Sequence, residues 1–258
     1  FSTHQYYCVD VFQDDLLKKL AFLNSKGFVQ CFGDVVTREC PPKADTHIGR
    51  TFEYLLGVEI NNQQKPDYKG IELKSHKLLS GSAITLLANN PHYFFSDKWV
   101  IRKTTKLFYP WYESVCGNGE FLNNTVKFRN PNSQGLYLDI SNDNLRIQIC
   151  DSKDVACLEW DIEALEEKLI EKFSEGAFLF CKTKNDQRGR ELFHLTKVFH
   201  VKYGKNNLLK TIKNSSIEID ILFRHKKTLK QTSFRAHKRN LINIFDIFNE
   251  YDLSEVDF

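Results

Sequence analysis

The sequence predicts an α/β or α+β fold with a central mixed β-sheet flanked by helices. Stretches with helical spacing of apolar residues alternate along the chain with short apolar runs that are typical of strands. The composition is that of an ordinary globular protein, with 41% hydrophobic and 27% charged residues among 258. No linker cleanly divides the chain, so we expect one folded unit that can contain two lobes.

Helical segments are predicted from apolar stripes and from glycines at their ends. Residues 15–27 carry leucines at helical spacing and stop at Gly27, and a short helix at 50–56 stops at Gly57. Asp161 is a typical helix cap, and an apolar stripe continues from it to Phe173. Two further helices are expected at 206–213 and 241–248.

Strands are predicted from short apolar runs bounded by turn residues. The expected strands are 58–61, 70–75, 83–88, 136–140, 145–150, 177–183, 191–203, 216–223 and 234–237. The fourth and fifth form a hairpin across the turn at 141–144. Residues 89–135 are rich in Asn, Gly and Pro, so we expect them to form loops inserted into the core.

The chain has no feature of a secreted or membrane protein. No apolar stretch approaches the roughly 20 residues that cross a bilayer, and the first residues do not form a signal peptide. The seven cysteines are odd in number and include no C-x-x-C pair, which disfavours a disulfide framework and the usual zinc sites. We therefore expect a reducing cytoplasm.

Four polar residues near residues 50–76 have the order expected of a metal-dependent phosphodiesterase. On a strand, Glu72 and Lys74 share one face at a separation of roughly 6.6–7 Å. Pro66 and Gly70 favour a turn that returns Asp67 to the side of Glu72. Taken singly, each of these residues is more often found on a solvated surface, so the signal lies in their combination.

A third carboxylate, Glu53, falls on the edge of the apolar stripe of the helix at 50–56. A carboxylate there is unfavourable unless it meets a cation. Oxygen ligands suit Mg²⁺, which polarises a scissile phosphate and lowers the pKa of bound water. Lys74 can orient or deprotonate that water, or neutralise charge on phosphorus, and the sequence leaves these roles open.

Positive charge is concentrated in residues 224–239, although the net charge is only +3. This basic segment contains no acid, which is typical of a nucleic-acid-binding face, although such runs are also often merely solvated. We expect Arg224 and Arg235 to reach bases or the near backbone. The other candidate DNA contacts are His76, Arg102, His225, Lys226, Lys227, His237, Lys238 and Arg239.

Residues 47–76 resemble the signature of the MvaI/BcnI restriction endonucleases, relatives of the mismatch-repair nickase MutH. The matching segments read H-I-G-R-T-F-E-Y-L-L-G, N-N-Q-Q-K, P-D-Y and I-E-L-K-S-H. Residues 82–91, 162–173 and 177–183 fit more loosely, as does T-S-F-R near residue 235. The chain departs from the pattern at His47, where a glycine is usual, and in the region after residue 99.

The resemblance implies a PD-(D/E)xK nuclease core in which Asp67, Glu72 and Glu53 bind metal and Lys74 is the catalytic lysine. It implies a type II site-specific deoxyribonuclease that depends on Mg²⁺, with Mn²⁺ as a substitute, and that cuts a short double-stranded DNA site as a monomer. It also implies a restriction-modification system with a cognate DNA methyltransferase that forms no stable complex with the nuclease.

On this reading, residues 1–258 form one nuclease domain with two lobes. The catalytic core lies around 45–90 and later strands, and DNA-recognition elements lie around 95–135 and 217–240. Two alternatives are a MutH-like sequence-specific nickase and a catalytically silent DNA-binding module. The presence of all four acid and lysine positions argues against the silent module.

Overall fold

The structure is a computed structural model that describes residues 15–32, 47–58, 66–94, 121–224 and 228–253. The chain forms two compact units, each assembled from separate stretches of sequence. Unit 1 consists of residues 1–81, 172–202 and 247–258, and unit 2 consists of residues 82–171 and 203–246. Within the described residues, no helix is both long and apolar enough to cross a membrane.

Unit 1 is built on a five-stranded sheet with the order β1-β10-β9-β2, in which β13 also pairs with β10. Its strands are β1 (Val29–Gln30), β2 (Glu72–Lys77), β9 (Gly176–Asn185), β10 (Glu191–Lys202) and β13 (Ile247–Asp252). Strands β2 and β9 are parallel, whereas β10 is antiparallel to its three neighbours. The predicted mixed sheet is therefore confirmed.

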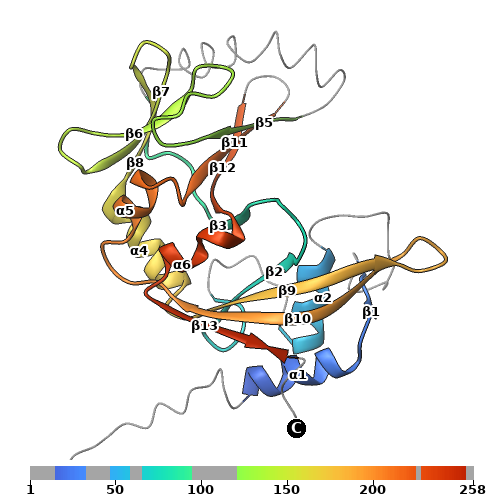
Figure 1. Cartoon of the computed structure of the whole chain (residues 1–258). Coiled ribbons are helices and arrows are strands. Elements are labelled where there is room, and N and C mark those ends of the chain that lie inside the picture. The colour runs from blue at the N-terminus through green and yellow to red at the C-terminus, as the bar shows by residue number, and fades with distance from the viewer. Residues whose placement is uncertain (1–14, 33–46, 59–65, 95–120, 225–227, 254–258) are drawn as a thin grey trace, which may run out of the picture. The chain divides into compact units, whose positions relative to one another are not determined.

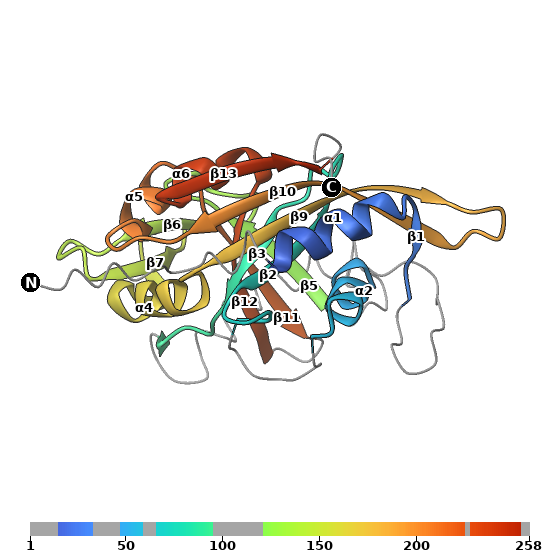
Figure 2. The same ribbon diagram turned by 90° about the horizontal axis from the view of Figure 1, so that it is seen from below.

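Two helices cover one face of this sheet, α1 (Leu17–Ser25) and α2 (His47–Leu56) (Figures 1 and 2). Their apolar side chains join those of β2, β9 and β10 in one buried cluster. Leu73 is the member from β2, which fixes the face of β2 that α2 covers. The side chains of Glu72 and Lys74 alternate with Leu73 and therefore belong to the opposite face.

The ends of both helices follow the sequence prediction. Gly27 and Gly57 have φ of 69° and 74°, the left-handed conformation that commonly terminates a helix. Helix α2 begins at His47, three residues before the predicted start. The side chain of Thr51 explains part of this longer helix, because its hydroxyl donates to the carbonyl of His47 at 2.7 Å and accepts from the amide of Phe32 at 3.1 Å.

Unit 2 contains two antiparallel four-stranded sheets, with the orders β3-β12-β11-β5 and β4-β8-β7-β6. The first comprises β3 (Ile84–Ala88), β5 (Phe121–Val126), β11 (Glu218–Arg224) and β12 (Thr228–Ala236). The second comprises β4 (Tyr93–Phe94), β6 (Tyr137–Ile140), β7 (Arg146–Cys150) and β8 (Ala156–Asp161). Its helices are α4 (Ile162–Lys172, whose last residue belongs to unit 1), α5 (Leu208–Lys213), η2 (Lys238–Asn240) and α6 (Leu241–Ile244).

One predicted segment was wrong, and another contains strands that were not predicted. The loop-rich region at 89–135 includes β4 and β5, which pair with β8 and β11. The helix predicted at 241–248 ends at Ile244, and the chain then forms β13 along β10. In both places backbone pairing with a distant strand decides the structure, and local sequence carries no sign of that partner. The strand predicted at 58–61 lies outside the described residues from residue 59 onward.

Gly176 lies on β9 where the chain is closely packed, and it is the register partner of Glu72 on β2. A β-carbon at this position would lie 2.8 Å from Phe173 Cδ1 and 3.2 Å from Val201 Cγ2. Phe173 is fully buried and stacks on Phe178 with ring centroids 5.9 Å apart. It has little room to move, because interiors are close-packed.

We predict that Gly176→Ala lowers the free energy of unfolding by about 1–3 kcal/mol, the usual effect of overpacking a core. Gly81→Ala is the matched control, because no atom lies within 4 Å of a β-carbon built at Gly81. Chemical denaturation of both variants measures the difference. Equal stability of the two variants would contradict the packing argument.

Candidate active site

The turn before β2 brings two carboxylates together. Tyr68 and Ile71 pair through two backbone hydrogen bonds of 2.9 and 2.8 Å. Between them, Lys69 and Gly70 have φ of 48° and 90°, as in the type I′ turns that close tight hairpins. The residues that flank this pair, Asp67 and Glu72, therefore lie opposite one another across the hairpin.

Asp67 is held by the backbone of β2. Its Oδ2 accepts a hydrogen bond from the amide of Leu73 at 3.0 Å. Burial raises the pKa of the Asp67 carboxyl, and the neighbouring charge of Glu72 raises it further, against opposing effects of the Leu73 amide and nearby lysines. The ionised form of Asp67 is therefore disfavoured, chiefly because burial removes the carboxylate from water.

Glu72 is the most deeply buried of the four predicted residues, with 1% of its surface exposed. Its Oε1 forms ion pairs with Lys74 on the same strand and with Lys172, at 3.1 Å, from the end of α4. A buried carboxylate is tolerated only when it is paired, and here two ammonium groups supply the compensation. The role of Lys172 was not predicted from the sequence. This residue lies 98 positions after Lys74 and resembles an ordinary basic residue in the last turn of a helix.

Glu53 lies partly buried on α2. Burial raises its pKa, the charge of Asp67 adds to this effect, and Lys74 and Arg50 lower it. The charges of Asp67, Lys74 and Glu72 all act on the Glu53 carboxyl, so the four predicted residues are electrostatically coupled.

This cluster suits a hard divalent cation. Its donors are carboxylate oxygens, the ligand type that Mg²⁺ prefers. The carboxyls of Glu53 and Asp67 both have raised pKa values, which a bound cation would lower. Within the described ranges, no three His, Cys, Asp or Glu side chains already have metal-binding geometry. Lys74 and Lys172 both form ion pairs with Glu72 Oε1.

His76 continues the same face of β2, two positions beyond Lys74. Its ring meets the edge of Phe180 with centroids 6.3 Å apart, and the residue is partly exposed. It lies beside the candidate site, where the DNA contact expected of it stays a prediction.

Two residues of the basic segment have acidic partners in unit 2. Arg235 forms an ion pair with Asp220 and donates to the carbonyl of Ala83, and His237 Nε2 lies 3.5 Å from Glu218 Oε1. Both acids belong to β11, which pairs with β12. The segment itself contains no acid, but the neighbouring strand supplies two, and the sequence did not reveal that pairing.

The other predicted DNA contacts of the basic segment differ in how fully the structure describes them. Arg239 is exposed on η2, next to the partly exposed Lys238. Arg224 ends β11, and its side chain is not described. The other four predicted contacts lie outside the described residues: Arg102, His225, Lys226 and Lys227.

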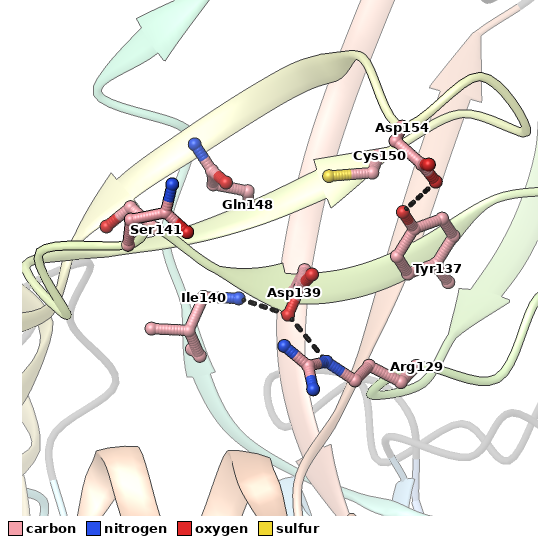
Figure 3. Close-up of a pocket in the computed structure, with 9 residues that line it drawn as sticks. Arg129, Tyr137, Asp139, Ile140, Ser141, Gln148, Cys150 and Asp154 are labelled. Carbon is pink, nitrogen blue, oxygen red and sulfur yellow. Dashed lines mark hydrogen bonds and ion pairs between the residues drawn. The ribbon is translucent and has the colours of Figure 1, made fainter.

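Unit 2 also contains a polar hollow of about 690 Å³ (Figure 3). Its main charged groups already have partners, since Arg129 Nε lies 3.0 Å from Asp139 Oδ1 and the Tyr137 hydroxyl donates to Asp154 at 2.6 Å. Burial raises the pKa of the Cys150 thiol to about 12, so this thiol stays protonated and weakly nucleophilic near neutral pH. The hollow therefore offers no catalytic centre to compete with the carboxylate cluster.

The known proteins that this chain resembles are restriction endonucleases. A family model described as the MvaI/BcnI restriction endonuclease family matches residues 17–245. A solved structure titled "Restriction endonuclease MvaI-cognate DNA substrate complex" is similar over 94% of this chain and 98% of that chain, with 22% identity and a TM-score of 0.69. Another, "Restriction endonuclease MvaI in the absence of DNA", covers 93% and 97%, with 21% identity and a TM-score of 0.45. No curated protein sequence matches.

We predict that Lys172→Met destabilises unit 1 by about 1–3 kcal/mol, because it leaves the buried carboxylate of Glu72 with one cation fewer. Lys202→Met is the matched control, since Lys202 is an exposed lysine of the same unit. Thermal and urea unfolding at neutral pH measure both. Equal stability of the two variants would show that Lys74 alone compensates Glu72.

Proposed function

Because the chain belongs to the MvaI/BcnI restriction endonuclease family and is a type II site-specific DNA endonuclease, we propose that it cuts double-stranded DNA by Mg²⁺-dependent phosphodiester hydrolysis at the cluster of Glu53, Asp67, Glu72 and Lys74. The observation that carries this proposal is the hairpin that sets Asp67 opposite the buried Glu72, with Lys74 on the same face of β2. Mn²⁺ is expected to replace Mg²⁺, since both accept carboxylate oxygens.

Asp67 and Glu72 provide the carboxylate oxygens that hold the ion, and Glu53 adds a third from α2. When bound, the ion polarises the scissile phosphate and lowers the pKa of a bound water. The Leu73 amide fixes the orientation of Asp67 through its bond to Oδ2, so one oxygen is committed to the backbone and the other is available. Glu72 is thus positioned by a strand and Glu53 by a helix, and such elements hold a site more firmly than loops do.

The two lysines at Glu72 have different positions and therefore different proposed roles. Lys74 alternates on β2 with Leu73, and its side chain is 26% exposed, so its ammonium can reach a phosphate or a water at the site. We assign to Lys74 the orientation of the attacking water and the neutralisation of charge developing on the phosphate. We assign to Lys172 the compensation of the buried charge of Glu72, through its ion pair with the same oxygen, Oε1.

The two units suggest a division of work. Unit 1 contains the proposed catalytic cluster, and unit 2 contains the basic segment, so we propose that unit 2 recognises DNA. Arg239 and Lys238 are the described residues best suited to meet phosphates. Arg235 and His237 first hold β12 to β11, and any DNA contact by them has to compete with Asp220 and Glu218. We further propose a monomer in the bacterial cytoplasm, paired in function with a DNA methyltransferase.

We predict that Asp67→Ala reduces DNA cleavage by at least about 10³-fold, because the proposed site loses a metal ligand worth several kcal/mol in the transition state. Sequence-specific DNA binding, measured by gel shift in Ca²⁺, is expected to be retained. Asp186→Ala is the control, since Asp186 lies in the β9–β10 turn of the same unit. Digestion of a DNA of known sequence, with the ends mapped, gives the readout.

Wild-type protein is expected to give discrete fragments with Mg²⁺ or Mn²⁺ and none with EDTA. Intact DNA under all these conditions would refute hydrolysis at this cluster. Equal cleavage by wild type and Asp67→Ala would refute the role of Asp67 alone.

We predict that Arg239→Gln weakens binding about equally for all DNA sequences and lowers the slope of log affinity against log salt by about 1, as expected when one phosphate contact is lost. Lys202→Gln, an exposed cation in unit 1, is expected to leave the slope unchanged. Titrations over a range of salt concentrations measure the slope. An unchanged slope for Arg239→Gln would exclude a phosphate contact there.

A further inference from the structure

Residues other than the proposed metal ligands contact the turn that carries Asp67. Asp15, just before α1, accepts a hydrogen bond from the Tyr68 hydroxyl at 2.9 Å through Oδ2. The same carboxylate oxygen forms an ion pair with Lys69, and Lys19 lies 3.9 Å from the other oxygen. One acid therefore contacts two successive residues of the catalytic turn, and neither contact involves the proposed metal ligands.

The aromatic ring of Tyr68 is buried in the core, in addition to the hydrogen bond that its hydroxyl donates. Tyr68 is 5% exposed and belongs to the buried cluster that includes Leu16 and Leu20. Lys19 of α1 stands over the ring, with its ammonium 5.0 Å from the centroid. The start of α1 thus holds Tyr68 both by packing and by a polar bond.

The turn needs such support because of its backbone conformation. Lys69 occupies the left-handed region with φ of 48°, which is unfavourable for a residue with a β-carbon. Its ion pair with Asp15 stabilises this conformation. The hydrogen bonds to Lys69 and then to Tyr68 hold the pKa of Asp15 below its usual range, so Asp15 is ionised at neutral pH.

Asp67 directly precedes Tyr68, and its own carboxylate is tied to the Leu73 amide on the other arm of the hairpin. We propose that Asp15 is a positioning residue for the catalytic turn: by holding Tyr68 and Lys69 it fixes the place of Asp67 opposite Glu72. The ion pair with Lys69 is exposed and therefore weak, whereas the bond from the buried Tyr68 hydroxyl to a carboxylate is charge-assisted. Tyr68→Phe, which removes only that hydroxyl, is therefore the most informative variant.

Hydrogen exchange in the metal-free full chain tests the inference without using activity. The amides of Ile71 and Leu73 donate to Tyr68 O and Asp67 Oδ2, so their exchange reports the closed turn. We expect Tyr68→Phe and Asp15→Asn to speed their exchange by about 5- to 10-fold, the effect of losing one hydrogen bond. Asp186→Asn is the control, because Asp186 also accepts several hydrogen bonds in a turn of unit 1, but away from this hairpin.

Cleavage kinetics provide the second readout, which rests on the proposed function. Tyr68→Phe and Asp15→Asn are expected to raise the Mg²⁺ concentration for half-maximal cutting and to lower kcat about 3- to 30-fold, with the KM for DNA unchanged. Asp15→Glu, which retains the carboxylate, is expected to recover part of the loss. The effects of the two variants should not add fully in the double mutant, since both weaken the same hydrogen bond between Tyr68 and Asp15.

The outcomes separate the two hypotheses. Failure of the wild-type protein to cut DNA would overturn the proposed function, and hydrogen exchange would still decide the role of Asp15. If the amides of Ile71 and Leu73 exchange at the wild-type rate in both variants, the positioning role is overturned. Faster exchange throughout unit 1, instead of at this hairpin, would also overturn it, because Asp15 would then act only on general stability.

Discussion

The carboxylate of Glu72 lies almost wholly inside unit 1, and the proposed chemistry requires it to be ionised there. Desolvation opposes that charge, and the ammonium groups of Lys74 and Lys172, both paired with Oε1, offset it. Lys74 comes from the same strand, but Lys172 comes from the end of α4, just before Phe173 and β9. The packing of Phe173 against Gly176 and Phe178 therefore serves electrostatics as well as the core, since it sets where Lys172 emerges.

Much of the candidate site could be predicted because its determinants are local. The turn from Asp67 to Glu72 is encoded by neighbouring residues, and alternation along β2 places Lys74 beside Glu72 on one face. The edge of the α2 stripe similarly indicated Glu53. The mixed sheet followed from the order of helices and strands, and the comparisons confirm a restriction endonuclease fold.

What escaped prediction depends on residues far apart in the sequence. Lys172, Asp15 and the acids of β11 become significant only when the fold brings them to Glu72, Tyr68 and Arg235. Strand β13 is similar, because residues 247–252 become a strand only along the free edge of β10. Local patterns determine which face a side chain occupies, but they do not determine which distant partner meets it.

The parallel pairing of β2 with β9 has a consequence for how the protein is made. The strands that meet at Glu72 and Gly176 are separated in the sequence by nearly all of the first stretch of unit 2. Such long-range pairing forms late, since the closure of a long loop must precede it. During synthesis, the ribosome therefore releases Asp67 and Glu72 long before Lys172 and β9 exist to complete their surroundings. A nascent or truncated chain would therefore lack an ordered active site. Such a chain would not cleave the DNA of the cell that makes it.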